Sequence, residues 1–197
     1  MSISKTELIN NALTKVGALP ITSIDDDTNN ARVVSRVYEQ SLRSILGECK
    51  WNFATTRTTL SLLTDTLAWY DTGETLVYQK PTNLIRIYGA SAPNTAWREE
   101  GDYIVSDTSS LGLRYTYYID SPTKYPSTFT DAFIDKLCSD IAYMIVNSAS
   151  LGELYKKLYE TVSLPKAMAA NSQSGIQQTL QDDAWELAKT QNSQPDA

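Results

Sequence analysis

The longest amphipathic pattern in the chain runs from Asp25 to Ala54 and predicts a long helix that ends at aromatic residues. Apolar side chains recur in it at three- and four-residue spacing, which is typical of the buried face of a helix. These positions are Ala31, Val34, Val37, Tyr38, Leu42, Ile45, Leu46 and Cys49. Thr28 or Asp27 is expected to cap the first turn, beside carboxylates whose negative charge faces the positive end of the helix dipole. Trp51 and Phe53 follow at once and are predicted to be core residues.

A shorter helical pattern precedes the long one. Ser4 to Glu7 fits a capping box, in which the first and last side chains satisfy each other's backbone N–H groups. The apolar stripe that follows stops at Gly17, a residue type common just past a helix end. We expect the Pro20 connection to fold this first helix back onto the long one.

Helical spacing returns after Pro126 and predicts three more helices. The first is expected to begin at Thr130 or Asp131, and its apolar stripe consists of Phe133, Ile134, Leu137, Ile141, Met144 and Ile145. The second opens with a capping-box pattern at Ser150. Pro165 suits the first turn of the third, whose apolar stripe is thin.

Between these blocks, residues 55–120 alternate with a period of two and are broken by Gly, Pro, Asn and Asp, which is typical of strands and turns. The predicted strands are Thr58 to Leu62, Leu67 to Tyr70, Thr75 to Gln79, Leu84 to Tyr88, Thr95 to Arg98, Tyr103 to Val105 and Leu111 to Ile119. Turns are expected at residues 71–74 and 100–102. No helical pattern separates the strands, so the sheet is predicted to be antiparallel.

The predicted fold is α+β: a helical bundle split by an antiparallel β-rich insertion. Residues 1–54 and 128–197 form the helical domain, with helices before residue 54 and after residue 128. Residues 55–127 form the inserted domain. The predicted core of the bundle draws on both halves and includes Val34, Val37, Tyr38, Leu42, Ile45, Leu46, Trp51, Phe53, Phe133, Leu137 and Ile141.

Four short motifs occur in an order that resembles the tail tubular protein A family, the head-to-tail adaptors of short-tailed bacteriophages. They are Gly17-Ala18-Leu19-Pro20-Ile21-Thr22-Ser23, the acidic run Asp25 to Asp27, Ala31-Arg32 through Tyr38-Glu39, and Trp51-Asn52-Phe53-Ala54. A Tyr-rich strand before the third helix and a Leu151 to Tyr155 step extend the resemblance over nearly the whole chain. It is clearest in residues 8–54 and 111–170.

The resemblance implies a structural virion protein that is not an enzyme. Such a protein forms a dodecameric ring between the portal protein and the tail nozzle protein, with the tail fibre protein as a further candidate neighbour. DNA passes through the channel without sequence-specific binding. The implied location is the neck of the virion tail, and the host cytoplasm before assembly. Whether the isolated chain is a monomer or already a ring stays open.

The composition fits a structural role. The 197 residues contain no histidine, which removes the usual general base, the Ser–His and Cys–His pairs and the commonest transition-metal ligand. We therefore expect no cofactor and no metal site. The net charge of −6 gives no whole-chain attraction to phosphate. The two cysteines belong to no paired motif and are expected to be core residues, and no apolar run is long enough to span a bilayer.

One stretch keeps an enzyme hypothesis open. Trp97 stands just before Glu99, Glu100 and Asp102, and an aromatic platform beside paired carboxylates can bind and hydrolyse a sugar chain. Some tail proteins related to the family have been associated with cell-wall degradation. The alternative function is therefore a virion-associated peptidoglycan-degrading enzyme. A charged hairpin tip explains the same residues without catalysis.

The C-terminal helix has too few apolar positions to be stable alone, and we expect it to dock on another chain. The resemblance favours the portal as that partner. The residues predicted to bind it are Ile176, Leu180, Trp185 and Leu187. A frayed surface helix is the alternative. A third hypothesis for the whole protein is a host-directed interaction module that is absent from the virion.

Overall fold

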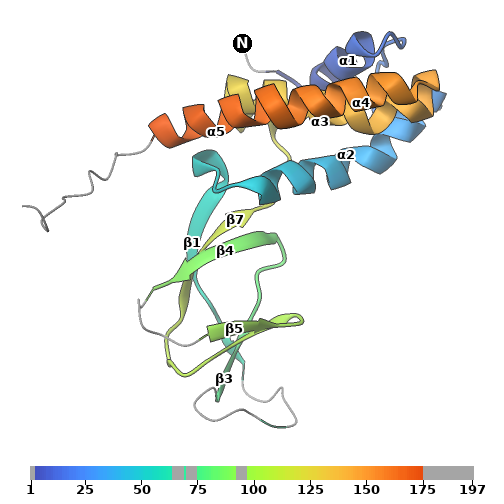
Figure 1. Ribbon diagram of the computed structural model, residues 1–197. Helices are drawn as coiled ribbons and strands as arrows, with labels where there is room; N and C mark the ends of the chain where they lie inside the picture. The colour runs from blue at the N-terminus through green and yellow to red at the C-terminus, as the bar shows by residue number, and fades with distance from the viewer. Residues whose placement is uncertain (1–2, 64–68, 70–74, 92–96, 175–197) are drawn as a thin grey trace, which may run out of the picture.

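The computed structural model describes residues 3–63, 69, 75–91 and 97–174, and it shows a helical unit above a smaller β unit (Figure 1). Antiparallel sheets are inserted between N-terminal and C-terminal helices, which confirms the predicted α+β class. The helical unit contains α1 (Lys5–Lys15), α2 (Asn29–Glu48), α3 (Ser127–Val146), α4 (Ala149–Leu158) and α5 (Leu164–Gln173). None of the described helices combines the length and apolar character needed to cross a membrane.

The first two helices begin where the sequence predicts. The Ser4 side chain accepts from the Glu7 backbone N–H and completes a capping box, and Gly17 follows α1 with φ +80°, a conformation that favours glycine. Of the two candidate caps for α2, Thr28 is the one used, because its hydroxyl accepts from the N–H of Ala31. The helix ends at Glu48, and Asn52–Ala54 forms a single 3₁₀ turn.

The predicted start of α3 at Thr130 or Asp131 is wrong by about one turn. The helix begins at Ser127, directly after Pro126, which has no helical N–H to satisfy. The hydroxyl of Thr130 donates to the carbonyl of Pro126 at 3.2 Å and so lies inside the first turn. Asn147 ends the helix with φ 53°.

The predicted cap at Ser150 is also wrong, because Ser148 accepts from the N–H of Leu151 and starts α4 two residues earlier. Pro165 does lie in the first turn of α5, but α5 is not a separate helix. A π-helical segment, Tyr159–Ser163, joins α4 to α5 without a break. A proline ring in a regular helix clashes with the carbonyl four residues earlier, and the wider π turn relieves that crowding.

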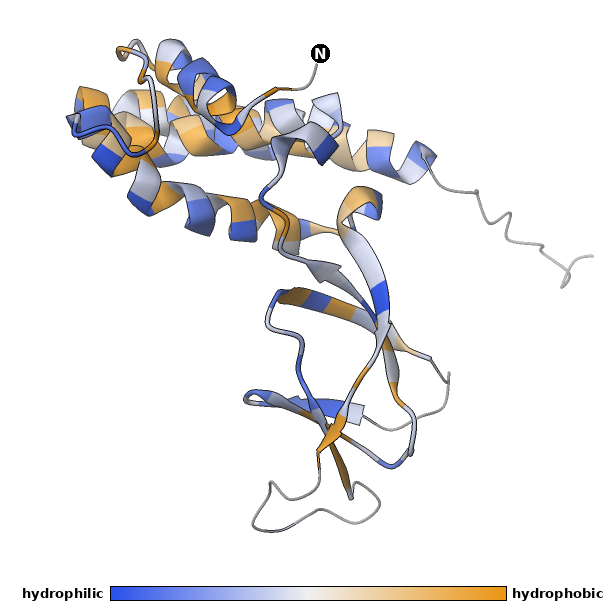
Figure 2. Ribbon diagram, turned by 180° about the vertical axis from the view of Figure 1, so that it is seen from behind, coloured by the Kyte–Doolittle hydropathy of each residue, from blue (hydrophilic) through white to orange (hydrophobic). Residues whose placement is uncertain are grey.

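The core of the helical unit is formed by α1, α2 and α3 together. Nine of the predicted core residues are buried: Val34, Tyr38, Leu42, Ile45, Leu46, Trp51, Phe133, Leu137 and Ile141. Val37 and Phe53 are only half-buried and pack against this core from its margin. The rings of Trp51 and Phe129 meet edge to face at 4.9 Å, so the segment after α2 is held against the start of α3. Figure 2 shows the alternation of hydrophobic and hydrophilic residues along these helices.

The β unit consists of two antiparallel sheets. One has the order β1-β7-β4, from β1 (Thr55–Thr59), β7 (Gly112–Tyr117) and β4 (Leu84–Ala90). The other has the order β2-β3-β6-β5, from β2 (Leu62–Leu63), β3 (Leu76–Gln79), β6 (Tyr103–Ser106) and β5 (Trp97–Glu100). A second hydrophobic core, which includes Leu60, Tyr78, Ile104, Leu113 and Tyr115, lies between them.

Four strand predictions agree in place with β3, β4, β6 and β7. The predicted strand Thr58 to Leu62 is wrong, because the chain divides there into β1 and β2. Residues 95–96 of the strand expected at Thr95 to Arg98 lie outside the described residues, and β5 runs from Trp97 to Glu100, two residues past the predicted end. The strand expected at Leu67 to Tyr70 and the turn at residues 71–74 lie outside the described residues, apart from the exposed side chain of Trp69.

Polar contacts join the two units where α2 ends. The Arg86 guanidinium donates to the carbonyl of Gly47 at 3.2 Å, and the hydroxyl of Tyr88 donates to the carbonyl of Cys49 at 2.9 Å. The Arg43 guanidinium lies 4.4 Å from the centre of the Tyr118 ring. The carbonyls at the C-terminal end of α2 thus find partners in the β unit.

Candidate interaction site

A hollow of about 540 Å³ opens on the β1-β7-β4 sheet. Its lining is mostly small or polar and consists of Arg57, Thr58, Thr59, Gly89, Ala90, Ser91, Gly112, Leu113 and Arg114. The side chains of Leu113 and Tyr115 point into the core between the sheets, so that of Arg114 points to the opposite face. The hollow therefore presents two guanidinium groups among short side chains.

Arg57 and Arg114 are direct cross-strand neighbours in the register of β1 with β7. Opposed residues in an antiparallel pair have Cβ atoms about 5 Å apart, and like charges in such a pair repel. Neither guanidinium makes a hydrogen bond or an ion pair with another residue in the part of the chain that the structure describes. Two positive charges are thus held side by side, with no carboxylate of residues 3–63, 69, 75–91 or 97–174 paired to either.

One wall of the hollow depends on a glycine. The N–H of Ser91 donates to the carbonyl of Gly112 at 2.7 Å, and the N–H of Gly112 donates to the Ser91 hydroxyl at 3.0 Å. A Cβ atom at position 112 would lie only 3.1 Å from the Cβ of Ser91. Gly112 therefore permits the close approach that fixes this wall.

The carboxylates of the enzyme hypothesis lie elsewhere. Glu99 and Glu100 are on β5, and Asp102 is in the two-residue turn that leads to β6; all three side chains are exposed. The Lys80 ammonium lies 3.4 Å from Glu99, and the Arg98 guanidinium lies 3.7 Å from Glu100. None of the three acids lines the 540 Å³ hollow, so their geometry is that of a charged hairpin rather than a cleft around a sugar.

The residues predicted to bind the portal, Ile176, Leu180, Trp185 and Leu187, lie outside the described residues. The structure does show how α5, the last described helix, ends. The backbone N–H and side-chain amide of Asn52 donate to the side chain and carbonyl of Asn171, both at 2.8 Å. The Asn171 amide in turn donates to the carbonyl of Lys50 at 2.8 Å. The end of α5 is therefore fastened beside the junction of the two units.

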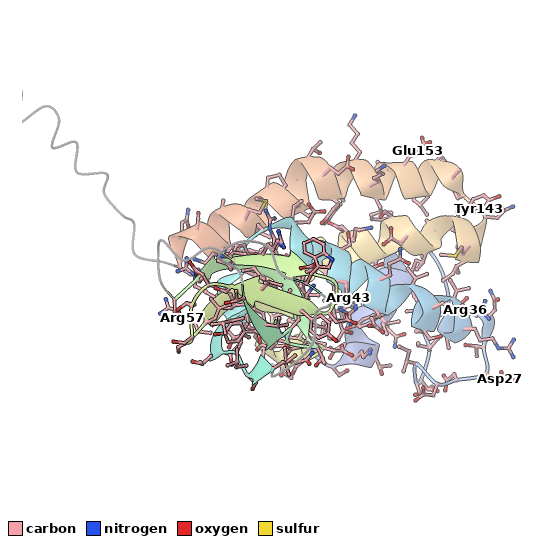
Figure 3. All side chains as sticks on the ribbon, turned by 90° about the horizontal axis from the view of Figure 1, so that it is seen from below. Asp27, Arg36, Arg43, Arg57, Tyr143 and Glu153 are labelled. Carbon is pink, nitrogen blue, oxygen red and sulfur yellow. The ribbon has the colours of Figure 1, made fainter. Side chains whose placement is uncertain are left out.

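The continuous α4–α5 helix exposes several apolar side chains. Leu154, Val162 and Met168 are exposed, with 60% of Leu154 accessible. Tyr143 and Met144 at the end of α3 are exposed as well, although Met144 was predicted in the buried stripe (Figure 3 labels Tyr143). Scattered exposed apolar residues are normal on a monomer, so this surface alone identifies no partner.

Asp135 is the one carboxylate side chain in the described helices that is almost fully buried. One of its oxygens lies 2.7 Å from the Lys15 ammonium of α1, and the other accepts from the hydroxyl of Ser163 in the π segment. Burial lowers the pKa of Lys15, but the hydrogen bond to Asp135 and its charge outweigh this, and the pKa is raised. Asp135 thus ties three helical segments together, a structural role.

The acidic run before α2 also has a local explanation. Asp26 accepts hydrogen bonds from the N–H and hydroxyl of Thr22 and from the N–H of Ser23. These hydrogen bonds lower the pKa of Asp26, and the bond from the Thr22 hydroxyl has the largest effect. Asp27 pairs with Arg32. Among the described residues, no group of three or more Cys, Asp or Glu side chains could hold a metal ion.

No protein-family model matches the sequence, and a search of curated proteins gave no match.

The sequence-based predictions did not single out Arg57 or Arg114. Each looks like an ordinary polar position on a strand. The two are 57 positions apart in the sequence, but they lie opposite each other because β1 and β7 pair directly. Their opposition is a consequence of register between distant strands. Without the pairing of β1 with β7, no local signal could have revealed it.

Proposed function

We propose that the chain is a structural subunit of a head-to-tail adaptor ring, located between a phage portal and the tail nozzle around the DNA exit channel. Twelve copies would close the ring by contacts between unlike surfaces of neighbouring subunits. The proposed location is the neck of the virion tail, and the host cytoplasm before assembly. The nozzle protein is the second partner, and the tail fibre protein is a further candidate.

The observation that carries this proposal is that the motifs of the resemblance form one physical unit. Ala31, Tyr38, Trp51 and Ala54 are all buried in the core shared with α3. The side chain of Asn10 brackets Ile21 in the Gly-Pro loop, donating to its carbonyl at 2.9 Å and accepting from its N–H at 2.8 Å. The same residues that suggest the family therefore build the helical unit.

Charge supports the channel part of the proposal. A subunit with net charge −6 does not neutralise the phosphates of a duplex, so DNA can slide past a wall of such subunits without being held. The composition favours a conduit over a DNA-binding protein.

Deletion of residues 175–197 tests the assignment of the portal surface. The cut keeps α5, because Ala167 is buried and Asn171 fastens the helix end. We expect the shortened chain to keep its unfolding midpoint and to lose binding to purified portal. Retained portal binding would contradict the assignment, and the full-length variant Trp185→Ala reports whether the predicted anchor is responsible.

Two other hypotheses have direct tests. Peptidoglycan release by the wild type that is lost in Glu99→Gln, Glu100→Gln and Asp102→Asn variants would favour the muralytic alternative. Mass spectrometry of purified particles separates the virion protein from the host-directed module, since absence from particles rules out the adaptor.

A further inference from the structure

The opposed arginines on β1 and β7 would be stabilised by an external anion. Arg57 is exposed and Arg114 is half-buried, and neither has a carboxylate partner within the described residues. A directly opposed like-charge pair destabilises a sheet, while either position on a strand accepts a neutral residue such as Thr. The arrangement is therefore unfavourable in the isolated chain and becomes favourable when an anion lies between the two groups.

The hollow is shaped for carboxylates rather than for a nucleic-acid backbone. A planar guanidinium binds a carboxylate through two parallel hydrogen bonds, and the short side chains of Gly89, Ala90 and Ser91 leave room for a side chain to enter. Two cations do not make the extended basic surface that duplex DNA requires, and the whole chain is acidic. A short acidic protein segment is the better match.

An acidic segment of this kind is present on the chain itself. The β5–β6 hairpin carries Glu99, Glu100 and Asp102 against a single arginine, Arg98. Only Glu99 and Glu100 have ion-pair partners, at 3.4 and 3.7 Å, whereas Asp102 at the tip makes no ion pair with a described residue. β5 is drawn in hydrophilic colour in Figure 2.

The hairpin and the hollow lie on opposite sides of the β unit. In Figure 1, β5 runs toward a hairpin tip on the right of the β unit. In Figure 3, which is turned only about the horizontal axis, Arg57 lies at the left edge of that unit. The two surfaces therefore lie on different sides of the β unit within one chain, so unlike surfaces of neighbouring copies can meet in a head-to-tail contact.

We propose that the hollow formed by Arg57 and Arg114 in one copy binds the acidic β5–β6 hairpin of the next copy, with Asp102 at its tip entering between the guanidinium groups. This contact would be one of the subunit interfaces of the proposed adaptor ring, and the inference rests on that proposed function. It is electrostatic, so it weakens as salt is raised.

A charge exchange tests this contact. One full-length variant carries Arg57→Glu and Arg114→Glu, and a second carries Glu99→Arg, Glu100→Arg and Asp102→Arg. Each variant alone presents like charges on both surfaces, so its self-association, measured by sedimentation velocity at low salt, should weaken about tenfold or more. An equimolar mixture restores opposite charges at both contacts and should associate as the wild type does.

Two controls keep the result interpretable. The neutral variant Arg57→Gln/Arg114→Gln should unfold at the same denaturant concentration as the wild type or a higher one, because the like-charge pair is gone. Charge reversal of Glu153, an exposed residue on α4 (labelled in Figure 3), should leave self-association unchanged.

The outcomes also separate this contact from the proposed function. The contact is wrong if the charge-reversed variants lose self-association and the mixture does not restore it. It is also wrong if charge reversal changes assembly neither in the isolated protein nor on portal. In both cases rings bound to portal would still support the adaptor. If the mixture restores self-association but the protein does not bind portal, the contact is supported and the adaptor function is contradicted. If the reversed arginines instead abolish binding of a DNA duplex and leave self-association intact, phosphate is the ligand and the proposal is wrong.

Discussion

Asp135 of α3 and Lys15 of α1 form an ion pair in which the carboxylate oxygen and the ammonium nitrogen are 2.7 Å apart. The side chain of Asp135 is only 6% exposed, whereas that of Lys15 is 43% exposed. The second oxygen of Asp135 is taken by Ser163, so one buried group joins the first helix, the third helix and the π segment. This arrangement makes the N-terminal and C-terminal halves of the chain depend on each other.

We expect Asp135→Ala to lower the free energy of unfolding by about 2–3 kcal/mol, because two hydrogen bonds to a charged group are lost. The matched control is Glu39→Ala, which removes an exposed ion pair with Arg43 on α2. That change should alter stability by less than about 0.5 kcal/mol. Equal effects of the two substitutions in urea unfolding would contradict the role assigned to Asp135.

The tryptophans provide a second matched pair. Trp51 is 1% exposed, donates from Nε1 to the carbonyl of Ile45 at 2.8 Å and packs on Phe129. Trp51→Ala should lower the free energy of unfolding by about 3–5 kcal/mol through the lost burial and the cavity left behind. Trp69 is 71% exposed, and Trp69→Ala should change stability by no more than about 0.5 kcal/mol. Thermal unfolding of both variants distinguishes them.

Two buried tyrosines should respond in opposite directions when their hydroxyl groups are removed. The hydroxyl of Tyr159 in the π segment is buried and has no hydrogen-bond partner among the described residues, so Tyr159→Phe should raise stability by about 1 kcal/mol. The hydroxyl of Tyr125 donates to the carbonyl of Ile119 at 2.7 Å, so Tyr125→Phe should lower it by about 1 kcal/mol. The same sign for both changes in denaturant unfolding would be inconsistent with these contacts.

The buried thiol of Cys138 links stability to alkaline pH. Burial raises the pKa of Cys138 from its ordinary value of 9.0 to about 12. The folded state therefore keeps a proton that the unfolded state loses above pH 9, and the stabilisation present below pH 9 is lost between about pH 9 and pH 12. The free energy of unfolding should fall by about 1.4 kcal/mol per pH unit from this group.

The measurement for this linkage compares Cys138→Ala with the wild type between about pH 9.5 and 11 under reducing conditions. The variant should show a shallower fall, because it lacks the retained proton. Cys49 is half-buried, and burial raises its pKa to about 11, so Cys49→Ser should have a smaller effect that ends at lower pH. Identical pH slopes for Cys138→Ala and the wild type would mean that the thiol has the same pKa in the folded and unfolded protein, which would contradict its burial.

Local chemistry explains most of what the sequence predicted about the fold. The capping box at Ser4, the cap at Thr28 and the glycine end at Gly17 involve residues a few positions apart, so the pattern alone identifies them. The period change at residue 55 likewise marks the inserted sheets. These features need no knowledge of distant contacts.

The errors arise where two local signals compete or where a distant contact decides. Ser148 and Ser150 are both residue types that suit a helix cap, and the cap in the structure is Ser148, which directly follows the left-handed Asn147. Pro165 predicts a new helix, but packing of α4 and α5 along α3 keeps them continuous through a π segment. The opposition of Arg57 and Arg114 depends on the pairing of the first strand with the last, which no local pattern contains.

The adaptor proposal is tested most directly by negative-stain imaging of the full-length protein mixed with purified portal from the same phage. The account predicts a second ring of twelve subunits stacked on the portal ring. Portal rings that stay bare when the folded protein is present in excess would contradict it.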